Sequence, residues 1–209
     1  MESVRDYMAQ INIIPVMVIN ELDGVEELAH CLAENGLGVL EITLRTELAI
    51  PAVDKIKAKY PEMVVGTGTN VNTYDLDRSM DAGADFMVSP GATTGLLEYA
   101  KKKNLPLLPG VATASEVMQA MSIGFENLKL FPAQAVGGIP LLKSWAGPLP
   151  QVKFCPTGGI NAANASEYLA LDNVLCVGGS WMLDKQIIAN KDWSALEQQL
   201  IQMNSELNI

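Results

Sequence analysis

The feature that most constrains the fold is a short apolar run that recurs every 20 to 25 residues and is followed by a helix-like stretch. The runs predicted as strands are 13–19, 38–44, 63–67, 84–88, 105–108, 128–131, 152–155 and 174–177. Helical patterns cover 24–35, 50–59, 73–82, 95–103, 114–123 and 162–170. Parallel neighbours need a crossover connection, so this alternation predicts a parallel α/β sheet. Eight such units close into a (β/α)₈ TIM barrel.

The chain shows no boundary between domains. No low-complexity stretch, charge block or Ser/Pro-rich linker interrupts it, so one domain over 1–209 is predicted. Gly36, Gly83 and Gly124 each stand five residues before a strand position, where a helix ends and a strand follows. An open doubly wound sheet is the second choice, because no G-x-G-x-x-G turn follows the first strand.

Charge excludes several classes of partner. Lys and Arg total 14 against 24 Asp and Glu, a net charge of −10, which disfavours nucleic acid and anionic membrane surfaces. A small anionic substrate stays possible, because backbone N–H groups and one or two basic side chains act locally. No apolar run approaches the ~20 residues of a membrane span. Three cysteines without a C-x-x-C pair predict reduced thiols in the cytoplasm.

Lys129 is a residue that an apolar strand rarely contains, since lysine is almost never fully buried without a partner or a purpose. Alternation puts Asn127, Lys129 and Phe131 on one face, so the amine points into the barrel if the intervening leucines face the helices. Burial disfavours the charged ammonium, and a neutral amine is what Schiff-base formation requires. A structural lysine satisfied by a carboxylate is the alternative that this segment leaves open.

A second polar face lies on the strand predicted at 38–44. The residues that share it by alternation are Val39, Glu41, Thr43 and Arg45. Glu41 and Arg45 are about 13 Å apart along a strand at ~3.3 Å per residue, so they are predicted to serve different parts of a ligand. Glu41 is predicted to act as an acid or base, and Arg45 to bind a carboxylate. A purely structural Glu41–Lys129 ion pair is the alternative.

Two Gly-Gly loops follow the last two predicted strands. They are Gly158-Gly159, in the motif PTGGI, and Gly178-Gly179, in the motif VGGSW. Successive glycines let backbone N–H groups turn towards a ligand, and a following helix N-terminus adds its positive end. Because phosphate-binding barrels hold phosphate after strands seven and eight, these loops predict a phosphate site. No His/Cys/Asp cluster suggests a metal, and neither a metal nor a cofactor is predicted.

Seven motifs, in order along the chain, resemble a known family. They are LEITLRT (40–46), GTGT (66–69), SPG (89–91), LPGVAT (108–113), KLFPA (129–133), PTGGI (156–160) and VGGSW (177–181). As a set they resemble bacterial 2-keto-3-deoxy-6-phosphogluconate (KDPG) aldolase, a family that also acts as 4-hydroxy-2-oxoglutarate (KHG) aldolase. The similarity runs from about residue 12 to residue 183.

The resemblance implies a class I aldolase: a trimeric (β/α)₈ barrel with a short N-terminal helix that releases pyruvate from a phosphorylated 2-keto acid. It implies that Lys129 forms the Schiff base and that Glu41 moves protons during carbon–carbon cleavage. The residues implied to hold the pyruvoyl end and to shape its pocket are Arg45, Thr69, Pro90, Phe131 and Thr157. Those implied to bind phosphate are Gly158, Gly159, Gly179 and Ser180.

Two positions depart from the family pattern, and two other functions stay open. Asn70 stands where an apolar residue is expected, and Gln134 where an acidic one is expected; both are predicted to affect the acceptor site. Another phosphate-binding barrel enzyme, an epimerase or a synthase, would use the glycine loops without a neutral lysine. A catalytically silent barrel that binds a phosphosugar would keep Lys129 in a structural ion pair.

Overall fold

Strands and helices alternate along the chain, and the computed structural model describes residues 3–207. The strands are β1 (Ile13–Met17), β2 (Val39–Thr43), β3 (Val64–Gly68), β4 (Phe86–Val88), β5 (Leu107–Leu108), β6 (Gly110–Val111), β7 (Asn127–Leu130), β8 (Lys153–Pro156) and β9 (Val177–Gly179). The helices are α1 (Val4–Ala9), α2 (Val25–Glu34), α3 (Ala49–Lys59), α4 (Thr73–Asp81), α5 (Thr94–Lys103), α6 (Ala114–Ser122), α7 (Gly138–Ala146), α8 (Ala165–Leu169), α9 (Lys185–Ala189) and α10 (Trp193–Leu207). Every predicted strand and helix overlaps an observed one.

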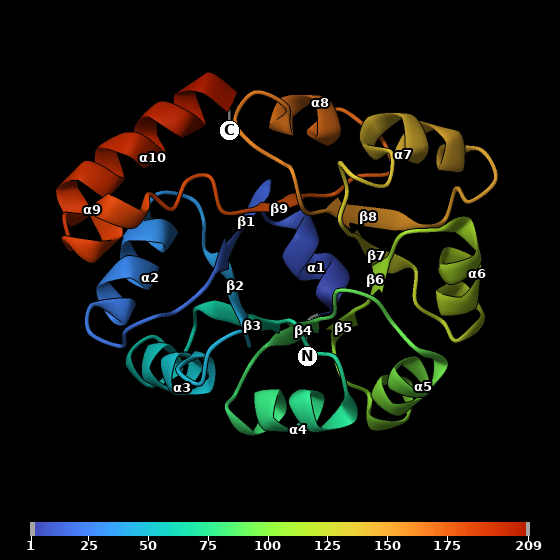
Figure 1. Cartoon of the computed structure of the whole chain (residues 1–209), viewed down its shortest axis with the longest axis horizontal. Helices are drawn as coiled ribbons and strands as arrows, with labels where there is room; N and C mark the ends of the chain where they lie inside the picture. The colour runs from blue at the N-terminus through green and yellow to red at the C-terminus, as the bar shows by residue number, and fades with distance from the viewer. Residues whose placement is uncertain (1–2, 208–209) are drawn as a thin grey trace.

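The strands form two parallel sheets. One has the order β5-β4-β3-β2-β1-β9 and the other the order β6-β7-β8. Isolated parallel bridges, Phe154 with Val174 and Thr157 with Gly178, connect β8 to the segment that carries β9. The strands curl around a common centre with helices outside them (Figure 1). The predicted parallel α/β fold is confirmed, but residues 3–207 contain nine strands divided between two sheets, where eight were predicted.

Pro109 separates β5, which overlaps the strand predicted at 105–108, from β6, which was not predicted. Leu107–Leu108 pairs with β4 in the larger sheet, and Gly110–Val111 pairs with β7 in the smaller one. Proline has no N–H to donate to a neighbouring strand, whereas its carbonyl accepts a hydrogen bond from the backbone N–H of Lys129 at 2.9 Å. The strand predicted at 105–108 is therefore present as β5, and β6 beyond Pro109 is an additional strand.

Residues at the turns define the helix ends. Side chains that cap the N-termini of α4, α5 and α6 are those of Asn72, Thr93 and Thr113. Gly36, Gly83 and Gly124 follow α2, α4 and α6 with φ of 83°, 77° and 92°. This left-handed conformation is easiest for glycine, so these three glycines end their helices as predicted.

Three helices lie where no element was predicted: α7, α9 and α10. Helix α7 begins at two glycines with positive φ, Gly137 and Gly138. Because adjacent glycines are typical of a loop, the sequence pattern did not predict a helix there. The buried residues of α10 are spaced three to four apart, a helical period. Within residues 3–207, none of the helices combines the length and apolar character that a membrane span requires.

A small core fills one end of the space inside the strands. Its buried residues are Val4, Tyr7, Met8, Ile11, Ile14, Val39, Phe86, Val88, Leu108, Cys155 and Cys176. Four of them come from α1 and the residues just after it, and Figure 1 shows this helix across the middle of the strands. The short N-terminal helix implied by the family resemblance is therefore present, begun by a capping box between Ser3 and Asp6.

The larger core lies between the strands and the surrounding helices. Leu40 and Ile42 of β2 and Leu128 and Leu130 of β7 are fully buried in it. Successive side chains of a strand point to opposite faces. Glu41 and Lys129, which lie between these apolar positions, consequently face the interior.

Candidate active site

Lys129 and Glu41 meet inside the strands. Lys129 lies on β7 and Glu41 on β2, and Lys129 Nζ is 3.1 Å from Glu41 Oε1 and 3.3 Å from Oε2. Their side chains are only 6% and 5% exposed. Nζ is also 5.3 Å from the centre of the Phe131 ring. The prediction that both side chains point inward is confirmed, and they form a buried pair of amine and carboxylate.

Gly68 provides the space for the Glu41 carboxylate. It is the register partner of Thr43 on the neighbouring strand β2, and a Cβ at this position would overlap the Glu41 side chain. Gly66, two residues earlier, leaves room for the Phe86 ring in the same way. The glycines of the GTGT motif are therefore required by close packing, and Thr69 follows them with an unusual φ of 65°.

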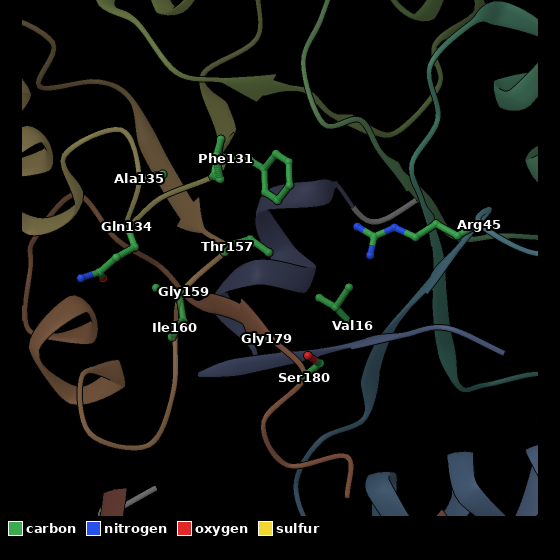
Figure 2. Close-up of a pocket in the computed structure, with 12 residues that line it drawn as sticks. Val16, Arg45, Phe131, Gln134, Ala135, Thr157, Gly159, Ile160, Gly179 and Ser180 are labelled. Atoms are coloured by element: carbon green, nitrogen blue, oxygen red, sulfur yellow. The ribbon is translucent and has the colours of Figure 1, made fainter. Parts of the chain in front are cut away.

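A cavity of about 560 Å³ opens at the carboxyl ends of β7, β8 and β9. Its lining residues are Val16, Arg45, Phe131, Pro132, Gln134, Ala135, Thr157, Gly158, Gly159, Ile160, Gly179 and Ser180. In Figure 2, Arg45 points its guanidinium towards Phe131 and Thr157, while Gln134 points away from them. Gly158 and Gly159 have φ of 97° and 81°, so the first glycine loop uses a conformation that other residues rarely adopt.

The turn after the first glycine loop differs from the prediction. The helix expected from 162 begins at Ala165. Asn164 Oδ1 accepts the backbone N–H of Asn161, and Asn164 Nδ2 donates to the Gly159 carbonyl oxygen, at 2.9 and 3.0 Å. A helix N-terminus therefore does not follow the loop directly. An asparagine-stabilised turn holds Gly159 instead.

The structure brings most of the predicted residues together. Those that line the cavity are Arg45, Phe131, Thr157, Gly158, Gly159, Gly179 and Ser180. Lys129 and Glu41 are buried beside it, since the Phe131 ring that lines it also faces Lys129 Nζ. Thr69 and Pro90 are not among the lining residues. They follow β3 and β4, and Thr69 is one residue beyond the glycine that packs against Glu41.

Four lining residues were not predicted: Val16, Pro132, Ala135 and Ile160. Pro132, Ala135 and Ile160 lie within or beside the motifs KLFPA and PTGGI, so their proximity to those motifs was an available signal. Val16 is the register partner of Glu41 on β1. Nothing in an all-apolar strand marks one residue as facing a cavity.

The Cys176 thiol is held in its protonated form. A hydrogen bond with Cys155 and complete burial raise the pKa of the Cys176 thiol well above its usual range. A thiol that stays protonated is a poor nucleophile. Across the described residues, no three His, Cys, Asp or Glu side chains gather as a metal site would require.

Comparison with known proteins decides the family. The family model described as KDPG and KHG aldolase matches residues 4–199. The chain belongs to this aldolase family. Family relatives include the KHG/KDPG aldolase of Escherichia coli K12, 44% identical over 184 residues, which are 88% of this chain and 86% of the relative. The 2-dehydro-3-deoxy-phosphogluconate aldolase of Pseudomonas aeruginosa is 43% identical over 186 residues, 89% of this chain and 84% of the relative.

A solved structure of the same family has a matching fold. The KDPG aldolase of Legionella pneumophila aligns with a TM-score of 0.93 at 44% identity and covers 97% of this chain and 98% of its own. In that crystal structure, pyruvate is captured at low pH as a covalent carbinolamine. A carbinolamine is the product that forms when an amine adds to a carbonyl carbon.

Proposed function

We propose that this member of the family is a class I aldolase, a carbon–carbon lyase that cleaves 2-dehydro-3-deoxy-6-phosphogluconate to pyruvate and D-glyceraldehyde 3-phosphate. It also cleaves 4-hydroxy-2-oxoglutarate to pyruvate and glyoxylate. The observation that carries the proposal is the buried Lys129–Glu41 pair, with 3.1 Å between Nζ and Oε1, beside a cavity bounded by two glycine loops. The family match and the carbinolamine of the Legionella enzyme support it.

Lys129 is the nucleophile of the proposed reaction. Its amine adds to the C2 carbonyl carbon to give a carbinolamine, and loss of water gives the imine. Removal of the C4 hydroxyl proton lets the C3–C4 bond break, so that the aldehyde leaves and the bonding electrons pass into an enamine. Protonation of C3 and hydrolysis of the imine then release pyruvate and restore the amine. The imine accepts the electrons, so this chemistry uses no metal or cofactor.

Glu41 is the proposed acid and base. Both of its oxygens lie within hydrogen-bond distance of Lys129 Nζ. This is the reach that proton transfer to and from the carbinolamine requires. Burial beside the amine keeps bulk water away from these transfers and from the enamine.

The two ends of the substrate are assigned to separate groups. Proposed to hold the pyruvoyl carboxylate are Arg45, Thr69 and Thr157, with Pro90 and Phe131 shaping the pocket. Proposed to bind phosphate are Gly158, Gly159, Gly179 and Ser180. The assignment of these four residues to phosphate is supported by their position: they line one cavity, on segments joined by the Thr157–Gly178 bridge. Arg45 is exposed and points into the same cavity, which supports its assignment as the cation that binds the pyruvoyl carboxylate.

The assembly is proposed from the family resemblance. The two sheets act as one (β/α)₈ barrel: the bridges between β8 and the β9 segment support closure on one side, and the single residue Pro109 between β5 and β6 supports it on the other. The chain is one domain over 1–209 and a cytoplasmic homotrimer. Light scattering should give a particle three times the 22.5 kDa chain mass. A particle of one chain at assay concentration would contradict the trimer.

Borohydride reduction in the presence of pyruvate tests the proposed function. We expect inactivation and one pyruvate-derived mass, mapped by peptide mass spectrometry to Lys129. Lys153, at the start of the adjacent strand β8, is the matched internal control and should stay unmodified because its Nζ donates to the Asp172 carbonyl oxygen near the surface. Labelling elsewhere, or none, would overturn the Schiff-base mechanism and favour an epimerase, a synthase or a silent phosphosugar-binding barrel.

Chelation provides an independent arm of the same test. Activity should survive exhaustive treatment with a chelator, because the amine and the carboxylate supply the proposed chemistry. A loss that a divalent ion restores would instead assign the protein to the metal-dependent aldolases.

A further inference from the structure

Asn70 connects the carboxyl ends of β3 and β4. It follows Thr69 and is completely buried. Its Nδ2 lies 2.9 Å from the Thr67 carbonyl oxygen and 3.1 Å from the Val88 carbonyl oxygen, and its backbone N–H also donates to Val88 at 3.1 Å. The ladder between the two strands reaches only the Thr67–Met87 pair. The Asn70 amide therefore extends the connection beyond the last ladder pair.

The other side of the amide is tied to helix α4. Ser79 Oγ lies 3.0 Å from Asn70 Oδ1, and Thr67 Oγ1 lies 2.8 Å from Ser79 Oγ. Asn70, Thr67 and Ser79 all have an exposed fraction of 0%. Buried hydrogen bonds of this kind resist rearrangement, because no water can replace a partner that moves away.

The residue beside Asn70 has a conformation that needs support. Thr69 is β-branched and has φ of 65°, a region that such residues rarely occupy and that persists only when the surroundings enforce it. On its other side, Gly68 is packed against the Glu41 carboxylate. Thr69 is thus held between a glycine in contact with the proposed acid–base and an asparagine anchored in the core.

We propose that Asn70 is a positioning residue for the pyruvoyl end of the substrate, and not for the acceptor site that the sequence predicted. Its amide holds the turn that carries Thr69 at a fixed distance from the turn that begins after Val88 and carries Pro90. It acts through these two residues and does not touch substrate. The proposal rests on the function proposed above, in which Thr69 and Pro90 serve the pyruvate-forming end.

The test compares Asn70→Val with Asn173→Val. Asn173 is a matched control: it is 5% exposed, and its Nδ2 donates to the Leu142 carbonyl oxygen at 2.9 Å, away from the residues assigned to substrate. Both substitutions remove a buried amide and fill its volume. The family pattern has an apolar residue at position 70, but in this chain valine would leave the buried Thr67 and Ser79 hydroxyls without the amide that they contact, so the expected loss is specific to this chain. We expect Asn70→Val to lower kcat/KM by roughly 10²-fold, the cost of a misplaced substrate-positioning group, mainly through KM. The pyruvate concentration that half-saturates borohydride trapping should rise in parallel. Asn173→Val should change only the melting temperature.

A crystal structure of Asn70→Val distinguishes a positioning role from a merely structural one, because only a positioning role predicts a change at Thr69. Thr69 should leave its φ of 65°, and an unchanged Thr69 would overturn the proposal whatever the kinetics. Equal effects of the two variants on kcat/KM would also overturn it. If Asn70→Val does not fold, Asn70→Ser provides the same measurements. Failure of the wild-type protein to form a pyruvate adduct would instead refute the proposed function, because that measurement does not involve the variant.

Discussion

The two ends of the space inside the strands differ in polarity. At one end, Tyr7 and Met8 of α1 pack against apolar side chains and two thiols. At the other end, Lys129 and Glu41 are buried as a hydrogen-bonded pair beside a cavity lined by glycine loops. Both ends are made by the same strands, and Cys155 of the apolar end is the register partner of Lys129.

This difference separates stability from chemistry. Burying apolar side chains stabilises the fold by about 25 cal/mol per Å² of area removed from water. A buried ion pair adds little, because desolvation offsets its attraction. The apolar end should therefore tolerate substitution without loss of turnover, and the polar end should lose turnover without a proportionate loss of stability.

Removing the amine should have the largest effect. Lys129→Met is expected to lower kcat/KM on the order of 10⁶-fold, as removal of other covalent nucleophiles does, and to abolish the borohydride adduct. Lys153→Met, on the neighbouring strand, should keep both activity and trapping. Steady-state kinetics and intact-mass measurements decide this, and comparable turnover in Lys129→Met would refute the amine mechanism.

Glu41→Gln should come next, because an amide keeps the shape of the carboxylate without carrying its proton. We expect kcat to fall by roughly 10²–10⁴-fold with little change in KM, and slower imine trapping. The matched control is Glu27→Gln, which breaks a half-exposed pair with Lys59 at the same 3.1 Å distance.

A purely structural Glu41–Lys129 pair predicts a different outcome. Leaving the ammonium without its partner would cost about 3–5 kcal/mol of unfolding free energy. Kinetics and thermal melting are measured on one preparation of Glu41→Gln. A destabilised protein with near-normal kcat would assign the pair to the fold and not to the reaction.

The glycine loop should show a smaller and substrate-dependent effect. In Gly159→Ala, the new Cβ would meet the Gln134 side chain, and the φ of 81° would be strained. KM for the phosphorylated substrate should rise roughly 10-fold, the loss of one hydrogen bond to a charged group. The unphosphorylated 4-hydroxy-2-oxoglutarate should be unaffected. Gly95→Ala, with open space around its Cβ, is the control; equal effects on both substrates would remove the phosphate assignment.

The apolar end should respond only in stability. Met8→Ala leaves a cavity under α1 and is expected to lower the unfolding free energy by about 2–5 kcal/mol, with kcat unchanged in the folded protein. Met118→Ala, at a side chain that is 61% exposed, should change neither. Urea unfolding followed by fluorescence measures the difference. A loss of kcat in Met8→Ala below the unfolding transition would show that the two ends are coupled.

The thiols should give the smallest effect. Because the pKa of Cys176 is raised, its thiolate is scarce at pH 8, and burial blocks access to both Cys155 and Cys176. Iodoacetamide at pH 8 should leave both unmodified in the native protein, with activity retained, and should modify both in urea. Rapid native alkylation of either thiol would mean that the apolar end opens.

The sequence determined the features that local patterns encode. Apolar runs that alternate with helical periods predicted the parallel fold, and the polar positions within apolar strands predicted that Lys129 and Glu41 face the interior. Two Gly-Gly pairs at strand ends predicted the lining of one cavity. Each of these signals spans only a few residues, so neither a register nor a long-range contact is needed to find it.

Only the tertiary structure decided how these parts meet. Lys129 and Glu41 are 88 residues apart in the chain, and their 3.1 Å separation depends on the register of several strands between them. The space that Gly68 leaves for Glu41, the break of a sheet at Pro109 and the bonds of Asn70 to two strand ends also depend on neighbours distant in sequence. The alternation of side chains along a strand specifies the face on which a residue lies. Packing against other strands specifies which atoms it touches, and the site's chemistry depends on those contacts.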